Sequence, residues 1–288
     1  MRREDFSFNS EDGIEIAYYR WRAPGKAAGI VQIAHGMGEH SLRYAHVAEF
    51  LNQAGFHVYA NDHRGHGRSV KGRESLGDFG EAGWNGLVAD MATLTHLART
   101  REGRLPVILL GHSMGSFAAQ HYVLDNSSLI AGLVLSGSAA VDKLSIDPSQ
   151  DADLTAFNRA FEPARTQHDW LSRDPAAVDA YEADPLCGFG INKKAMQTLM
   201  ASAIRLIDPA ALAQISRDLP IYIFAGDKDP INHDLEWLKP LAERYRAAGI
   251  ENVSEKYYPE GRHEMLNETN RDEVMRDLVG WLQKTITT

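Results

Sequence analysis

The chain has 288 residues, enough for one large domain with an inserted subdomain. Its net charge of -9, with Lys and Arg scattered along the sequence, disfavours nucleic-acid binding, which requires a basic patch. A single cysteine excludes an internal disulfide, and neither a signal peptide nor an apolar membrane-spanning run is visible, so we expect a cytoplasmic location and leave the oligomeric state open.

The N-terminal segment predicts a β-hairpin, because residues 6–23 alternate between apolar and polar side chains on both sides of Asp12-Gly13, and an Asp-Gly pair favours a tight turn. Beyond it, short apolar runs alternate with longer helical patterns. The runs are 30–34, 56–61, 106–111, 131–137, 220–226 and, more weakly, 253–259. Continuously apolar strands separated by helices are typical of a parallel sheet covered on both faces. We therefore predict an α/β fold with a doubly wound, mostly parallel sheet.

The alternation of strands and helices stops between residues 140 and 217. This segment is too long for a plain crossover, and Pro and Asp residues interrupt its helical patterns. We therefore predict an inserted helical cap at 141–216, on a core formed by 1–140 and 217–288. A cap above an active site excludes water and shapes the substrate pocket. It is also the part that could contact a membrane surface.

The segment 107–123, "VILLGHSMGSFAAQHYV", contains the strongest functional signal. An apolar strand runs into Gly111-His112-Ser113-Met114-Gly115, and a helix follows. This is the G-x-S-x-G nucleophile elbow in its strand–turn–helix context, in which the turn is so sharp that residues two positions from the serine must be small. We predict that Ser113 is a nucleophile exposed at the end of the sheet.

A serine nucleophile needs a base, and the base needs an acid that orients it. In this architecture the acid and then the base follow the serine along the chain. The strand 220–226 ends in Asp227-Lys228-Asp229-Pro230, and His263 follows the last strand. We predict Asp229 as the acid, because the bend at Pro230 presents it over the sheet edge, with Asp227 as the second candidate. His263 is the predicted base.

Acyl transfer also needs hydrogen-bond donors for the oxyanion. One donor is the backbone N–H of the residue after the nucleophile, Met114. The other comes from the loop after the third strand, where "HGMG" stands and Met37 supplies the natural second amide. We therefore predict an oxyanion hole formed by Met37 and Met114.

The motifs "HGMGEHSLRY", "NDHRGHGRS", "GHSMGS", "GDKDPI" and "GRHEM", in this order, resemble the monoacylglycerol lipase and lysophospholipase group of α/β-hydrolases, which is also grouped with the serine aminopeptidases. The resemblance extends from about residue 6 to 286. It implies Ser113, Asp229 and His263 as the catalytic triad and the Met37 and Met114 amides as the oxyanion hole. It also implies hydrolysis of single-chain lipid esters through an acyl-serine intermediate, without a cofactor.

A metal centre is a competing interpretation of the histidine-rich loops. Five potential ligands fall on loops that follow predicted strands: His35, Glu39, His40, His63 and His66. A zinc site needs ligands at rigid spacing, whereas Gly36 and Gly38 make their loop non-helical. We therefore expect no metal, and interpret His35, Glu39 and Arg43 as braces of the oxyanion loop. Three further residues are interpreted as braces of the loop after the fourth strand, with His63 and His66 as local hydrogen-bonding partners: Asp62, Arg64 and Ser69.

Three more functions are compatible with the same fold: a hydrolase of other small esters, an aminopeptidase and a non-catalytic ligand-binding protein. A non-catalytic ligand-binding protein has little need of a nucleophile, acid, base and oxyanion loop together. An aminopeptidase needs acidic groups that hold the substrate ammonium. The segment 141–216 contains several: Asp151, Asp153, Asp169, Asp174, Asp179, Glu182 and Asp184. Most are expected on solvated faces or at helix N-caps.

Large apolar side chains of the same segment favour an ester with a medium or long acyl chain. They are Leu154, Phe157, Phe161, Trp170, Leu171, Met196, Leu199, Met200, Ile204 and Leu206. Most are expected to form the core of the cap, and a fraction is expected to line an acyl pocket.

Overall fold

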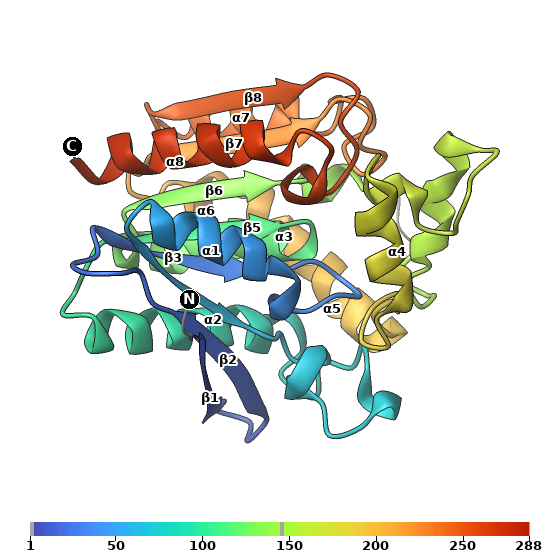
Figure 1. The fold of residues 1–288 in the computed structure, drawn as a ribbon, viewed down its shortest axis with the longest axis horizontal. Helices are drawn as coiled ribbons and strands as arrows, with labels where there is room; N and C mark the ends of the chain where they lie inside the picture. Colours follow the sequence, from blue (N-terminus) through green and yellow to red (C-terminus); the bar gives the residue numbers. More distant parts are fainter. Residues whose placement is uncertain (1–2, 145–146, 288) are drawn as a thin grey trace.

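The computed structural model describes residues 3–144 and 147–287, which form one eight-stranded sheet with helices on both faces (Figure 1). The strands are β1 (Arg3–Asn9), β2 (Glu15–Trp21), β3 (Gly29–Ala34), β4 (Phe56–Asn61), β5 (Val107–His112), β6 (Gly132–Ser136), β7 (Ile221–Gly226) and β8 (Val253–Tyr258). Their order across the sheet is β1-β2-β4-β3-β5-β6-β7-β8. From β4 to β8 all neighbours are parallel, which confirms the predicted fold class.

The predicted N-terminal hairpin is confirmed. β1 and β2 pair antiparallel, and Gly13 in the turn between them has a φ of 83°, which glycine adopts without strain. β2 then pairs antiparallel with β4, so the hairpin extends one edge of the parallel sheet.

Two apolar cores cover the two faces of the sheet. Side chains of β3 alternate between them, with Ile30 in one core and Val31 in the other. The core on one face is completed by α1 (Ala45–Gln53) and α8 (Arg271–Thr287), and the core on the other face by α2 (Gly83–Arg101), α3 (Met114–Asn126) and α7 (Lys239–Ala247). Short 3-10 helices lie in the connections: η1 (Ser41–Tyr44), η2 (Gly67–Ser69), η3 (Arg73–Ser75), η4 (Ser127–Leu129) and η9 (Met265–Asn267).

The long connection between β6 and β7 is helical. It contains η5 (Val141–Lys143), η6 (Leu154–Phe161), η7 (Asp169–Leu171), α4 (Pro175–Ala183), α5 (Lys193–Ser202), η8 (Ala203–Ile207) and α6 (Pro209–Leu212). Asp153 and Asp174 are N-caps in it, as the sequence predicts for part of its acidic residues. In Figure 1, α4 lies beyond the carboxyl ends of the strands. The assignment of 141–216 as a separate cap stays a prediction, and its residues 145–146 lie outside the described residues.

Within 3–144 and 147–287, no helix has the length and apolar character needed to cross a membrane.

The turn between β5 and α3 is possible only with glycine on either side of it. A Cβ on Gly115 would lie 2.2 Å from the Ala34 carbonyl oxygen, and one on Gly111 would lie 2.5 Å from the carbonyl oxygen of Gly115. Both contacts are with backbone that cannot rotate away. The start of α3 therefore packs directly on the end of β3.

We predict that Gly115→Ala destabilises the protein and that Gly280→Ala, the same substitution inside α8, stabilises it. Gly115 has no space for a methyl group, and forced overpacking costs about 1–3 kcal/mol. Gly280 has open space around it, and alanine in a helix is better than glycine by up to about 1 kcal/mol. Urea denaturation of both variants measures this. A Gly115→Ala protein as stable as the wild type would contradict the packing described above.

Candidate active site

Ser113 stands on the strained turn between β5 and α3. Its φ of 52° and ψ of −123° belong to a region that side-chain-bearing residues rarely adopt. The turn is held on both sides, because the Ser113 N–H donates to the Ser136 carbonyl at 2.9 Å and the Ser113 carbonyl accepts from the Phe117 N–H at 3.1 Å. Ser113 lies in the wall of a cavity at the carboxyl end of the sheet.

His263 lies in the wall of the same cavity and is joined to Asp229. Its Nδ1 is 2.9 Å from Asp229 Oδ2, and both side chains are buried. The other oxygen, Oδ1, accepts from the Ile231 N–H at 2.9 Å, so the turn after β7 fixes the carboxylate. The structure thus brings Ser113 and the His263–Asp229 pair, which are far apart in the sequence, to one cavity.

Burial alone would lower the pKa of His263, but the negative charge of Asp229 and its hydrogen bond raise it above the ordinary value of 6.5. Two rings pack on the imidazole, those of His112 and Trp170, at centroid distances of 4.7 and 4.9 Å. Burial lowers the pKa of His112 to about 4, so this neighbour is neutral near pH 7. Of the two imidazoles, His263 therefore has the higher pKa and is protonated more readily than His112.

Asp227 lies away from the histidine. Its Oδ1 accepts from the Glu260 N–H at 2.8 Å, which ties the turn after β7 to the turn after β8. Of the two aspartates that the sequence offers as the acid, the structure places Asp229 against His263 and Asp227 in a local backbone contact.

The loop after β3 presents the Met37 amide between two anchored neighbours. The Gly36 N–H donates to Glu39 Oε1 at 2.6 Å, and the Gly38 N–H donates to His66 Nε2 at 3.2 Å. Within the described part of the chain, the Met37 N–H has no hydrogen-bond partner, and neither has the Met114 N–H at the start of α3. Both residues line the cavity of Ser113. The loop is thus braced on each side of an amide that stays free to donate.

Arg43 neutralises two buried carboxylates beside this loop. Its guanidinium donates to Glu39 Oε2 at 2.6 Å and to both oxygens of Glu264 at 2.6 and 2.8 Å. Tyr44 donates to the other Glu39 oxygen at 2.7 Å. Burial would raise the pKa of Glu39, but Arg43 and these bonds lower it to about 2, so the carboxylate stays charged. Because Glu264 follows His263, Arg43 connects the oxyanion loop to the loop of the histidine.

Two further histidines of this region, His35 and His66, act as neutral hydrogen-bonding groups. His35 Nδ1 donates to the Gly36 carbonyl at 2.7 Å, and its Nε2 accepts from the His63 N–H at 2.9 Å. His66 uses Nδ1 on the Arg64 carbonyl and Nε2 on Gly38, and burial lowers its pKa to about 3. His35 and His66 each have one donor and one acceptor in use, which only the neutral imidazole allows.

The loop after β4 is braced in the way that the sequence suggests for Asp62 and Ser69. Asp62 accepts from the Ser41 N–H at 2.9 Å and from the Arg68 N–H at 2.8 Å, while the Ser69 hydroxyl donates to the Asp62 carbonyl at 2.7 Å. Arg64 instead reaches Asp90 of α2 and Asp12 of the hairpin turn, at 2.9 and 2.8 Å.

The cavity has a volume of about 170 Å³ and mostly apolar walls. Four of the large apolar residues singled out between 141 and 216 line it: Leu154, Phe157, Trp170 and Leu171. Met196, Leu199 and Leu206 are buried in the core instead, and Ile204 is 70% exposed. As expected, some of these apolar residues pack in the core and others line the cavity, whereas Ile204 lies on the surface.

Sequence reasoning missed several residues of the site. Glu264, Tyr44 and His112 belong to motifs quoted above, but no role follows for them from their own spacing. The sequence indicates only a local role for His66, whereas the structure shows that it holds the Gly38 amide. Gly137 is another residue of the site that sequence reasoning missed, because a Cβ at this position would lie 3.0 Å from His263 Nδ1. In the sequence, these residues are indicated by the motifs that contain them, because most of the motifs lie close to a predicted catalytic residue.

Comparison with known proteins gives a consistent result. The family model described as serine aminopeptidase, S33, matches residues 25–270. A monoacylglycerol lipase of Mycolicibacterium smegmatis is 32% identical, with 97% of each chain covered. Among solved structures, a thermostable carboxyl esterase from Bacillus coagulans, in complex with glycerol, has a TM-score of 0.88 and 29% identity with 99% of each chain covered. A monoglyceride lipase from Saccharomyces cerevisiae, at 22% identity, has a TM-score of 0.77 over 98% of this chain and 96% of its own, and supports the fold alone.

We predict that Asp229→Asn lowers kcat for ester hydrolysis by about 10³- to 10⁴-fold, because the amide no longer holds the histidine in the required tautomer. Asp227→Asn is the matched control. Its amide oxygen can still accept from the Glu260 N–H, so we expect a change of less than about threefold, within the spread for a surface contact. Hydrolysis of p-nitrophenyl butyrate measures both.

The pH dependence of kcat/KM is a second test of the contact between His263 and Asp229. A protonated His263 cannot accept the serine proton, so wild-type kcat/KM should fall as pH decreases through a pKa above 6.5. In Asp229→Asn the charge that raises this pKa is gone, and the acid limb should move to lower pH. An equal loss of rate in both variants, or an acid limb that does not move, would contradict the assignment of Asp229.

Proposed function

Since the chain belongs to the serine aminopeptidase S33 family of α/β-hydrolases and is a carboxylic ester hydrolase, we propose that it cleaves single-chain lipid esters of the monoacylglycerol or lysophospholipid type. The observation that carries the proposal is the shared cavity. Ser113 on its strained turn, His263 joined to Asp229, and the amides of Met37 and Met114 all adjoin one mostly apolar space.

In the proposed mechanism, His263 accepts the Ser113 proton while the serine oxygen attacks the ester carbonyl. The carbonyl oxygen becomes an oxyanion and accepts hydrogen bonds from the Met37 and Met114 amides, which stabilises the tetrahedral intermediate. Asp229 keeps the imidazole oriented and stabilises its protonated form. His263 then donates the proton to the leaving alcohol, and an acyl-serine ester remains.

Water completes the cycle. With the alcohol gone, neutral His263 accepts a proton from water, and the resulting hydroxide attacks the acyl-serine. The same two amides bind the second oxyanion. Collapse of this intermediate returns the proton to Ser113 and releases the fatty acid, so the enzyme is restored without a cofactor.

The walls of the cavity support a lipid acyl group. Phe157, Trp170 and Leu171 come from the connection between β6 and β7, and Ile231 and Trp237 from the segment after β7. Burial of an acyl chain against such surface contributes about 0.8 kcal/mol per methylene. This favours esters with longer acyl chains over esters with small acyl groups.

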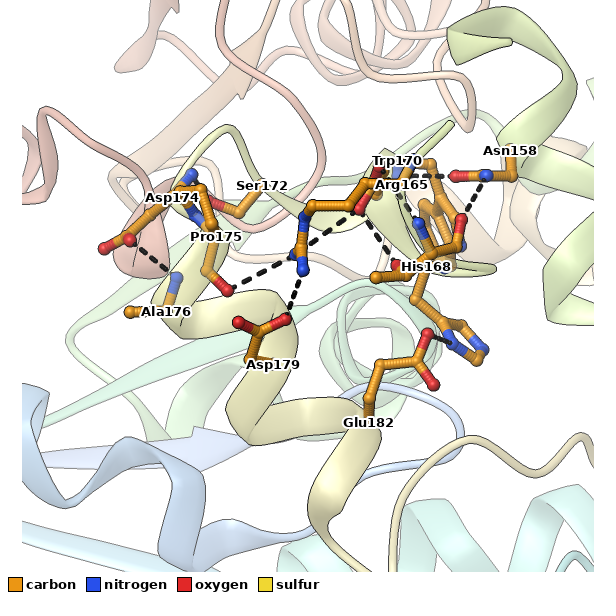
Figure 2. Close-up of polar contacts among 12 residues, drawn as sticks. Asn158, Arg165, His168, Trp170, Ser172, Asp174, Pro175, Ala176, Asp179 and Glu182 are labelled. Carbon is orange, nitrogen blue, oxygen red and sulfur yellow. Dashed lines mark hydrogen bonds and ion pairs between the residues drawn. The ribbon is translucent and has the colours of Figure 1, made fainter. Parts of the chain in front are cut away.

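Peptide substrates are less well supported. The two carboxylates that line the cavity, Glu39 and Glu264, are already paired with Arg43, so neither offers a free charge for a substrate ammonium. Carboxylates of the connection between β6 and β7 have partners of their own. Figure 2 shows three of them: Asp174 accepts from the Ala176 N–H, Asp179 pairs with Arg165, and Glu182 contacts His168.

Peripheral contact with lipid through the cap is part of the same proposal. It is supported by Ile204 and Ile207 of η8, which are 70% and 46% exposed. A cytoplasmic location stays a prediction of the sequence, and the oligomeric state stays open.

We predict that a fluorophosphonate probe labels the wild type at Ser113, and that Ser113→Ala abolishes both labelling and monoacylglycerol hydrolysis. The alanine variant lacks the nucleophile but keeps the fold, which circular dichroism checks. Ser116→Ala is the control, because its hydroxyl donates to the Ser113 carbonyl and is not placed to attack substrate. Labelling that survives Ser113→Ala would overturn the nucleophile assignment.

The substrate class is tested on the same wild-type protein. Fatty acid release from monoacylglycerols and lysophospholipids of increasing chain length should exceed release from diacyl lipids and from acetyl esters. Aminoacyl p-nitroanilides should not be cleaved. Preference for the anilides would overturn the lipid assignment while leaving the nucleophile in place.

A further inference from the structure

A second cluster of reactive side chains lies where the oxyanion loop meets the connection between β6 and β7. His40 follows that loop directly, and Asp184 and Cys187 follow α4. His40 Nε2 is 2.9 Å from Asp184 Oδ2. One ligand atom of each residue, a ring nitrogen, a carboxylate oxygen and the thiol sulfur, lies within 4.8 Å of the others.

Backbone contacts hold the three donors in this arrangement. The Gly188 N–H donates to the Gly38 carbonyl at 3.0 Å, which docks the turn 184–188 on the oxyanion loop. Within that turn the Cys187 N–H donates to the Asp184 carbonyl at 3.0 Å. Asp184 Oδ1 accepts from the Leu186 N–H at 2.9 Å, so Oδ2 is left for His40. The cluster is therefore set by local structure and by one contact across the junction.

The cluster is partly open to solvent, and Asp184 is the one carboxylate among its three donors. His40 is buried, whereas Asp184 and Cys187 are half-buried, so the cluster is accessible from one side. A divalent ion binds cysteine as the thiolate, so binding here requires Cys187 to lose its proton.

A comparable group nearby does not offer a site. Glu39, His112 and Glu264 also bring ligand atoms within 4.8 Å, but all three are buried. The Arg43 guanidinium already binds both carboxylates and occupies the place of the cation. Of these two groups, the cluster with Cys187 is the one that combines three donors, partial exposure and a sulfur atom.

We propose that His40, Asp184 and Cys187 bind Zn²⁺ and that the ion fastens the turn 184–188 to the oxyanion loop. Nitrogen, oxygen and sulfur donors in tetrahedral sites suit zinc, whereas Ca²⁺ and Mg²⁺ prefer oxygen ligands alone. The three side chains supply three ligands and water supplies the fourth. Binding releases the thiol proton of Cys187 to solvent. The ion takes no part in ester hydrolysis, so the site is independent of which ester the enzyme cleaves.

The first test is metal binding by the full chain, freed of metal with a chelator. Zn²⁺ should bind with a stoichiometry of one and raise the melting temperature by about 5 °C at a concentration 100-fold above its Kd. Co²⁺ should give the near-ultraviolet charge-transfer band of a thiolate ligand. Because the chain has a single cysteine, such a band in the wild type assigns the sulfur directly.

The variants locate the site. Cys187→Ser should lose the cobalt band and at least about tenfold of the zinc affinity, and His40→Gln should lose a similar part of the affinity. His96→Gln is the matched control, since His96 is an exposed histidine of α2 outside the cluster. Zinc binding that persists unchanged in both cluster variants, or a wild-type protein that neither binds Zn²⁺ nor shows the cobalt band, would overturn the proposal.

Discussion

The guanidinium of Arg43 donates to Glu39 on one side and to both oxygens of Glu264 on the other, and all three side chains are largely shielded from water. Charges in such a place are stable only while every partner is present, and removal of one partner from a buried pair costs about 3–5 kcal/mol. The two carboxylates belong to different loops. One loop carries the Met37 amide and the other carries His263, so the ion network requires both loops to be in place together.

The rest of the site follows from this constraint. Glu39 also accepts from the Gly36 N–H, which sets the loop on one side of Met37, and the Glu264 N–H donates to the Leu171 carbonyl at 2.7 Å. The connection between β6 and β7 is thereby placed against the loop of the histidine, where Trp170 packs on the His263 ring. The loop of Met37, the His263 imidazole and the cavity wall are thus aligned by contacts that no single loop could make alone.

Sequence reasoning was most successful where function depends on local structure. The strand–turn–helix around Ser113, the hairpin at Asp12-Gly13 and the order of the apolar strands along the chain all follow from short patterns. It could not assign Glu264, whose partner Arg43 is 221 residues away, because the contact exists only in the folded chain.

The same limit applies elsewhere. His40 and Asp184 are separated by 144 residues, and no spacing rule connects them. The hydrogen-bonding role of His66 depends on burial, which makes its imidazole neutral and able to accept.

The most direct test of the Arg43 network is the kcat of Arg43→Met. The control is Arg205→Met, which removes an exposed ion pair with Asp125. We expect about a hundredfold loss in kcat, similar to the loss of an oxyanion donor, for Arg43→Met only. A folded Arg43→Met protein with wild-type kcat would contradict the central role of this network.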